Sequence, residues 1–334
     1  MSKKYLTFIK VIISVGLACF LLFLVFRNIE WESFREKATT VDYSWVIYSI
    51  LLSVVAYVAR AYRWNILLKP LGYDLKTSRT TIAVLIGYFA NLALPRLGEI
   101  TRCGVLNRND RVPVPVALGT VVVDRIADVL MLFILMAAGL LLESDLLLKF
   151  LGSAYSDLKV PAWVPVIFVV VGLSGFIGLV IFIKKQHKLK GRFAEMVKGF
   201  VAGIISLKNI EKPIGFLVST LVIWVVYYLM SYLIVFSLPE TSHLDFSAGL
   251  LLLITGGIAI SLPVQSGFGT YHGMIAGMLL LYSVEQETGI FLATLLHTSQ
   301  IIAIAFFGTI ALVISFLIRR KQNQTGEIRS YEQA

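Results

Sequence analysis

Two carboxylates and an arginine lie close together in an otherwise apolar segment, and their spacing suits chemistry on one side of a helix. Asp124 and Asp128 are four residues apart and share a face, while Arg125 and Asp128 are three apart and can pair. Each charge at the centre of a membrane-spanning helix costs about 3 kcal/mol. These residues therefore either form a structural salt-bridge network or belong to a site, where a carboxylate could act as a base or hold a metal ion.

A second group of charges follows a break in the preceding apolar segment, residues 80–94. Pro95 ends that segment because proline clashes with the preceding helical turn. Arg96, Glu99 and Arg102 come directly after it. Together with Asp124, Arg125 and Asp128 of the next segment they make three positive and three negative charges. This balance favours a network that clamps the broken segment to the following span.

Arg60 and Arg63 lie three residues apart near the end of the apolar segment 45–68, and so share one helix face. Two interpretations stay open for them. Both side chains can extend to anionic lipid heads at the membrane surface. Alternatively, they supply the excess positive charge that binds an anionic head in a substrate site.

A glycine-rich break from Pro263 to His272 interrupts the apolar stretch 246–283. Broken helices expose free N–H groups that can bind anions, so Gly267 and Gly269 are candidates for a site. His272 is either a hydrogen-bonded packing residue or a proton carrier. The second role is possible because an unperturbed imidazole has a pKa of about 6.5.

Composition places these motifs in a membrane. The chain has 334 residues, 57% of them hydrophobic and only 15% charged, with a mean hydropathy of +0.82, whereas soluble domains carry about 25% charged residues. The net charge of +10 does not indicate nucleic acid, because the basic residues cluster beside apolar spans as the positive-inside rule expects. Neither a nucleotide-binding motif nor metal-type cysteine spacing is present. We therefore expect no cofactor, no metal and no nucleic-acid partner.

The apolar segments predict an all-α polytopic membrane protein with about six full transmembrane helices and two re-entrant broken-helix hairpins. The six spans are 11–26, 45–68, 116–142, 163–183, 213–238 and 290–318, each long enough with its flanks to cross about 30 Å of hydrocarbon. The hairpins are 80–111, turning at 94–98, and 246–283. If 80–94 crossed fully, the arginines that follow would lie outside, against the positive-inside rule. The protein is predicted to lie in the plasma (inner) membrane, with both termini on the cytoplasmic side.

One integral membrane domain, residues 1–320, accounts for almost the whole chain. Within it, residues 187–212 are predicted to form a cytoplasmic interfacial amphipathic helix, and residues 321–334 form a polar tail. Two broken hairpins that enter from opposite faces are typical of transporters built from an inverted repeat with a central site.

The motifs Asn91-x-x-x-Pro95-Arg96-x-Gly98-Glu99-x-x-Arg102 and Asp124-Arg125-x-x-Asp128, with the loop from Pro263 to His272, carry a family resemblance. Over nearly its whole length the chain resembles the lysylphosphatidylglycerol synthase transmembrane-region family, flippase-like integral membrane proteins. The resemblance implies a polytopic plasma-membrane protein. Some members are fused to a soluble aminoacyl-lipid synthetase and are credited with moving lipids between leaflets.

Two departures from the family pattern affect the expected substrate. The soluble synthetase domain is absent, so we do not expect this chain to aminoacylate phosphatidylglycerol. His272 stands where many relatives have a glutamate, which puts the same lipid substrate in question.

The leading prediction is a flippase-like transporter that moves an anionic phospholipid or lipid-linked intermediate between leaflets, rather than an enzyme. Its expected partners are membrane phospholipids or such intermediates. Whether the protein forms a homo-oligomer stays open. The alternatives are a membrane transferase acting on a lipid-linked sugar, with Glu99, Asp124 or Asp128 as base or metal ligand, and a non-catalytic scaffold or accessory subunit. No catalytic residue is assigned. The candidate substrate-binding residues are Arg60, Arg63, Asn91, Pro95, Arg96, Glu99, Arg102, Asp124, Arg125, Asp128, Gly267, Gly269 and His272.

Overall fold

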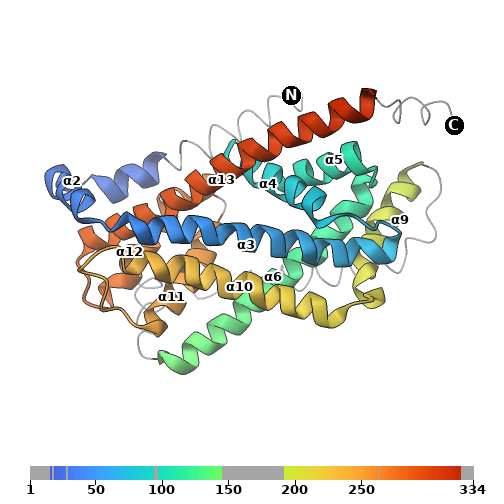
Figure 1. Cartoon of the computed structure of the whole chain (residues 1–334). Helices are drawn as coiled ribbons and strands as arrows, with labels where there is room; N and C mark the ends of the chain where they lie inside the picture. The colour runs from blue at the N-terminus through green and yellow to red at the C-terminus, as the bar shows by residue number, and fades with distance from the viewer. Residues whose placement is uncertain are drawn as a thin grey trace.

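The computed structural model describes residues 16, 19–27, 29–93, 97–144, 192–262 and 264–324, and this part of the chain is helical without a β-strand. Figure 1 shows the arrangement of the helices. Their bounds are α2 Trp31–Thr40, α3 Tyr43–Leu68, η1 Lys69–Leu71, α4 Thr77–Ala93, α5 Gly98–Asp110, α6 Val114–Leu142, α9 Arg192–Ile205, η3 Ser206–Asn209, α10 Pro213–Val235, α11 Phe246–Ser261, η4 Gln265–Gly267, α12 Thr270–Leu280 and α13 Gln286–Gln324.

Four helical stretches among the described residues are long and apolar enough to cross a membrane. They are Tyr43–Leu71, Val114–Leu142, Pro213–Val235 and Gln286–Arg320, with lengths of 29, 29, 23 and 35 residues. The expected all-α membrane class is confirmed. Of the six predicted spans, 163–183 and part of 11–26 (residues 11–15, 17 and 18) lie outside the described residues, so the count of six stays a prediction.

The long helices begin where the sequence supplies a cap or a proline. Asp42 precedes α3 and its carboxylate accepts a hydrogen bond from the Ser44 N–H at 3.0 Å, which satisfies one of the free donors of the first turn. Pro213 opens α10, where a missing N–H costs no helical hydrogen bond. Helices α3 and α10 then pack side by side along their length (Figure 1).

The first predicted break separates α4 from α5, and these two helices pack against each other. The Asn91 side-chain oxygen accepts a hydrogen bond from the Gly98 N–H at 2.7 Å and so ties the end of α4 to the start of α5. A Cβ at Gly98 would collide with the Gly87 carbonyl. The sequence of this pair thus allows a close approach of two backbones, as the hairpin prediction requires. Its depth in the membrane stays a prediction.

The second predicted break separates α11 from α12 by a short turn that contains η4. Ser266, Gly267 and Gly269 have φ angles of +47°, +75° and +79°, a region that only glycine adopts without strain. A Cβ at Gly269 would also collide with Leu21 of the N-terminal segment. The two glycines are therefore explained by the geometry of the turn.

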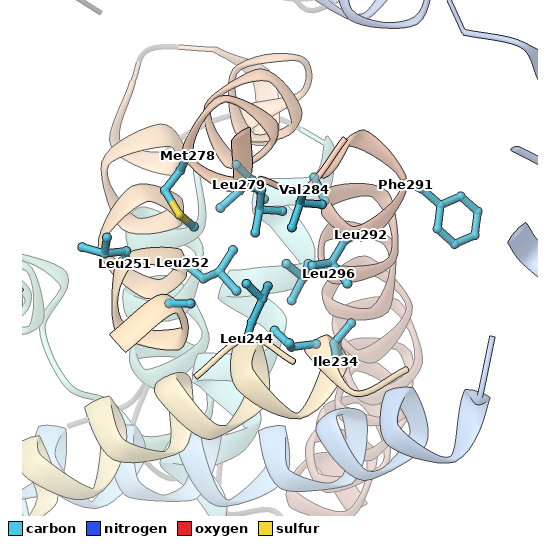
Figure 2. Close-up of a cluster of buried hydrophobic side chains, with 14 of the residues drawn as sticks. Ile234, Leu244, Leu251, Leu252, Met278, Leu279, Val284, Phe291, Leu292 and Leu296 are labelled. Carbon is cyan, nitrogen blue, oxygen red and sulfur yellow. The ribbon is translucent and has the colours of Figure 1, made fainter. Parts of the chain in front are cut away.

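The largest apolar core cluster holds this second pair of helices against the long helices. Side chains from α10, α11, α12 and α13 gather in it, among them Ile234, Leu252, Leu279 and Leu296 (Figure 2). Polar groups are rare in the cluster, because buried unpaired polar atoms are costly. The cluster fixes where the turn at Ser266 lies.

Of the predicted interfacial segment 187–212, residues 192–212 are described, and their helix α9 packs against α6. A Cβ at Gly119 or at Gly203 would collide with backbone atoms of the other helix. Small residues permit such close helix crossings in membrane proteins. The position of α9 at the membrane surface stays a prediction.

Candidate functional site

Helix α6 carries both aspartates of the first motif near its centre. Asp128 is the middle residue of the 29-residue helix Val114–Leu142, which at 1.5 Å per residue is about 43 Å long. The helix exceeds the hydrocarbon thickness of about 30 Å. Both carboxylates therefore lie near the middle of the helix, and their depth in the membrane stays a prediction.

Arg63 of α3 binds both carboxylates. Its Nη2 lies 2.6 Å from Asp124 Oδ1 and 2.6 Å from Asp128 Oδ1, and its Nε donates to Asp124 Oδ1 at 2.9 Å. The Arg63 side chain is fully buried and that of Asp124 is 1% exposed. Such short, charge-assisted hydrogen bonds are what makes a buried ion pair tolerable.

Three further arginines complete the network from α3, α5 and α6. Arg60 Nη2 lies 2.8 Å from Asp128 Oδ2, and Arg102 Nη2 lies 3.3 Å from Asp124 Oδ2. Arg125 Nη2 lies 3.2 Å from Asp124 Oδ2 and 3.5 Å from Asp128 Oδ2. The predicted pairing of Arg125 with Asp128 is confirmed, and so is a clamp between α5 and α6 through Arg102.

The structure corrects one of the two sequence-based interpretations of Arg60 and Arg63. Their side chains are 6% and 0% exposed and ion-paired, so the interpretation that they extend to lipid heads at the surface is wrong. Their role in a substrate site stays a prediction. The predicted balance of three against three also changes: four arginines and two aspartates meet, with a formal surplus of two positive charges.

Neutral side chains support the arginines, and sequence reasoning missed them. The Arg60 Nε donates to the Tyr227 hydroxyl at 2.5 Å, and Arg63 Nη1 donates to Thr220 Oγ1 at 3.3 Å. The Arg102 guanidinium lies 4.6 Å from the centre of the Trp64 ring, a favourable cation–π geometry. Polar residues inside otherwise apolar spans were the available signal for Thr220 and Tyr227, but their partners depend on how the helices pack.

Several polar atoms of the network keep unused hydrogen-bonding capacity. Within the described residues, Arg102 Nε, Arg125 Nε and Glu99 Oε2 are buried without a hydrogen-bond partner. Arg60 Nη1 also has none, although it lies 3.5 Å from Asp124 Oδ2. Since buried polar groups are normally satisfied, these atoms point to a missing partner such as water or a ligand.

A small cavity of about 10 Å³ lies beside these atoms. It has room for about one water molecule. Its polar lining comes from both sides of the first break and from α6: Tyr88, Asn91, Glu99, Arg102 and Arg125. Asn91 and Glu99 thus line the same cavity as Arg102 and Arg125.

The two breaks touch each other. Ser266 Oγ donates to the Asn91 carbonyl at 3.4 Å, and His297 Nε2 lies 2.9 Å from the Ser266 carbonyl oxygen. The His272 ring packs 5.2 Å from that of His297 and 5.7 Å from that of Phe26. His272 is therefore packed among rings, but its Nδ1 is buried without a hydrogen-bond partner in the described part of the chain. Its role as a proton carrier stays a prediction.

The predicted site residues divide into three groups. Seven charged residues form or border the network: Arg60, Arg63, Glu99, Arg102, Asp124, Arg125 and Asp128. Asn91 lines the cavity beside the network and contacts the second break, where Gly267, Gly269 and His272 lie. Pro95 and Arg96 lie outside the described residues. Across the described part of the chain, no group of three or more His, Cys, Asp or Glu residues could hold a metal ion.

Comparison with known proteins gives one family and one relative. The sequence profile of the lysylphosphatidylglycerol synthase TM region matches residues 9–308. A UPF0104 membrane protein of Methanocaldococcus jannaschii is 27% identical over 125 residues, which cover 36% of this chain and 35% of that protein. The chain thus matches about a third of the length of this relative. No solved structure matches.

Proposed function

Since this chain belongs to the lysylphosphatidylglycerol synthase TM region family, we propose that it moves an anionic phospholipid or lipid-linked intermediate between the two leaflets. The observation that carries the proposal is the network at the middle of α6, where four arginines face two aspartates. A phosphate head that crosses the hydrocarbon region needs a positive partner at that depth. The formal surplus of two positive charges provides it.

The aspartates hold the arginines in place for this task. Asp124 is bound by Arg63, Arg102 and Arg125, so the guanidinium groups are oriented before any lipid arrives. The buried N–H groups that lack a partner can then donate to phosphate oxygens. A site built in this way pays the ordering cost during folding, which leaves more of the interaction energy for the lipid.

The contact between the two breaks also supports transport. Broken helices that meet near the middle of a membrane are the sites at which many secondary transporters bind substrate and rearrange. Here the Asn91 and Ser266 contact joins the α4–α5 break to the α11–α12 break. Movement of either pair of helices would therefore displace the other pair.

The scaffold alternative rests on one specific observation, the complete pairing of Asp124 and Asp128. If the network only clamps α3, α5 and α6, its loss would lower stability without a separate effect on lipids. The transferase alternative is less well supported, because both aspartates are held by arginines and Glu99 is the remaining carboxylate near the network.

Reconstitution into vesicles tests the proposal. Fluorescent anionic lipid is placed in both leaflets, and the fraction that becomes accessible to a membrane-impermeant quencher is followed with time. We expect the parent protein to increase this accessibility and Arg125→Gln to reduce the rate at least tenfold, while Arg108→Gln, an exposed arginine on α5, behaves as the parent. Equal rates for empty vesicles and parent would exclude lipid movement, and incorporation of a labelled sugar from a lipid donor would indicate the transferase.

A further inference from the structure

Two parts of the chain repeat one order of helices. A long helix, a short helix, a break, a second short helix and a last long helix follow one another in α3–α6 and again in α10–α13. We call these sets the first unit and the second unit. In each unit the second short helix packs on the last helix: Arg102 of α5 binds Asp124 of α6, and the Tyr271 ring of α12 stacks 5.2 Å from the His297 ring of α13. The units are therefore equivalent in arrangement but not in chemistry.

The two units run antiparallel to each other. Helices α3 and α10 pack side by side (Figure 1), and Ser49 near the start of α3 donates to the carbonyl of Met230 near the end of α10 at 2.8 Å. At the opposite end, Ile66 of α3 and Phe216 of α10 share one core cluster. In transporters with inverted units, one unit rocks against the other around a central site. The α3–α10 pair is the axis that such a motion would use here.

The first short helix of each unit packs on the last helix of the other unit. Helix α4 lies on α13, where a Cβ at Gly308 would come within 2.7 Å of the Phe89 Cβ. Helix α11 lies on α6, where a Cβ at Gly257 would lie 3.3 Å from Leu132 Cδ1. We call the α4–α13 contact the first seam and the α6–α11 contact the second seam. Both seams use a glycine for close approach.

A hydrogen bond between side chains ties each seam at its far end. Asn109 near the end of α5 donates to Ser315 Oγ of α13 at 3.0 Å. Ser247 near the start of α11 donates to Glu143, the C-cap of α6, at 2.5 Å. These two ties lie at opposite ends of α6, because α5 ends just before α6 begins and Glu143 follows its last residue. The charged network at the middle of α6 therefore lies between the two seams.

A rocking motion of the units would leave the ion pairs of the network intact. Among the described residues, these ion pairs join α3, α5 and α6, which all belong to the first unit. The hydrogen bonds from its arginines to the second unit have neutral acceptors: Tyr227 for Arg60 and Thr220 for Arg63. Exchange of such a bond costs less than separation of a buried ion pair. The network can thus move as one body with the first unit.

We propose that the two seams are gates that open alternately, so that the network faces first one side of the membrane and then the other. When the first unit rocks about the α3–α10 axis, the first seam parts and the second closes, and the reverse motion parts the second seam. In the present structure the ties of both seams are formed, as in an intermediate between the two open states. This inference rests on the proposed function and adds to it the surfaces that move.

A wedge in one seam tests the alternation at the other seam. Gly308→Leu forces the first seam apart, and Ser247→Cys reports on the second seam through its rate of labelling by a membrane-impermeant thiol reagent in the purified full chain. We expect at least threefold slower labelling at position 247, because opening of the first seam closes the second. Conversely, Gly257→Leu should slow the labelling of Ser315→Cys at least threefold.

Two controls separate alternation from damage to the fold. Gly104→Leu, on α5 with open space at its Cβ, should leave both labelling rates unchanged. Cys103 is buried, and its labelling reports general unfolding once Cys19 is replaced by serine. If a leucine variant exposes Cys103, the smaller wedges Gly308→Ala and Gly257→Ala decide, with the same direction of change expected.

Unchanged or faster labelling at the distant seam, while Cys103 stays protected, would overturn the proposal, because independent seams give no protection at a distance. The labelling is measured without lipid movement, so its outcome is separable from that of the transport experiment. Reciprocal protection in a protein that moves no lipid would support the gates and contradict the transport proposal. Lipid movement with independent seams would do the reverse.

Discussion

Replacement of Asp128 by asparagine removes one of the two negative charges that hold the four arginines. Asp128 pairs with Arg60 and Arg63 at 2.8 and 2.6 Å, and with Arg125 at 3.5 Å. Its loss raises the formal surplus of the network from two to three positive charges. Breaking a buried ion pair by removing one partner costs about 3 to 5 kcal/mol. Because the Asp128 side chain is 13% exposed and that of Asp124 only 1%, we expect about 3 kcal/mol for Asp128→Asn and about 5 kcal/mol for Asp124→Asn.

Thiol labelling during thermal unfolding in detergent measures this loss. Cys103 is buried on α5 and reports opening of the network, while the exposed Cys19 is first replaced by serine. Asp74→Asn, in an exposed loop, controls for the change in charge. If Asp128→Asn unfolds at the parent's temperature, the network does not stabilise the fold and the reasoning fails. Normal unfolding with lost lipid movement would assign Asp128 to the lipid alone.

Four further predictions test other parts of the structure. Asp245 caps α11, and hydrogen bonds from Ala248 and Ser247 lower its pKa. Its contribution to stability is therefore present above the unfolded pKa of about 3.9 and is lost as the pH falls through the lower folded pKa. Asp245→Asn should cost about 1 kcal/mol of stability at pH 7, and the difference in unfolding temperature from the parent should vanish in acid. Gly98→Ala should destabilise the α4–α5 pair by about 1 to 3 kcal/mol, whereas Gly104→Ala, with open space at its Cβ, should not, as thermal unfolding would show. His272→Gln should keep the pH profile of lipid movement, because the ring is packed among aromatic residues; an altered profile would show that it carries a proton. A cysteine at position 108 should react only with cytoplasmic reagent, and external labelling would exclude the first re-entrant hairpin.

The sequence predicted the local features of the site but not its tertiary pairing. Helical spacing alone brings Arg125 to Asp128, and proline and glycine alone mark the two breaks, so these predictions needed no knowledge of packing. Arg60 and Arg63 lie more than 60 positions from their partners along the chain. Their side chains reach Asp124 and Asp128 only because α3 packs beside α6. No local pattern encodes that contact, and a surface position therefore stayed open for the same arginines.

The span count illustrates a related limit of hydropathy. The predicted span 116–142 includes both aspartates, and the structure confirms one unbroken helix of 29 residues there. Hydropathy measures the average over a window and does not report that a charge has a partner. Once each aspartate is paired with several arginines, the segment behaves as an apolar helix with a polar centre. Pairing, which composition does not report, makes the charges tolerable in an apolar helix.

The stoichiometry of the network argues for function over stability. A buried ion pair is often no more stabilising than well-packed apolar side chains of similar volume, so stability alone does not explain why three helices bring charges to the same place. A purely structural clamp would also balance its charges, since each uncompensated charge at mid-depth costs about 3 kcal/mol. Instead, among the described residues four arginines meet two aspartates, and the Nε–H groups of Arg102 and Arg125 lack an acceptor. An anionic ligand with several oxygens would supply both the missing charge and the missing acceptors.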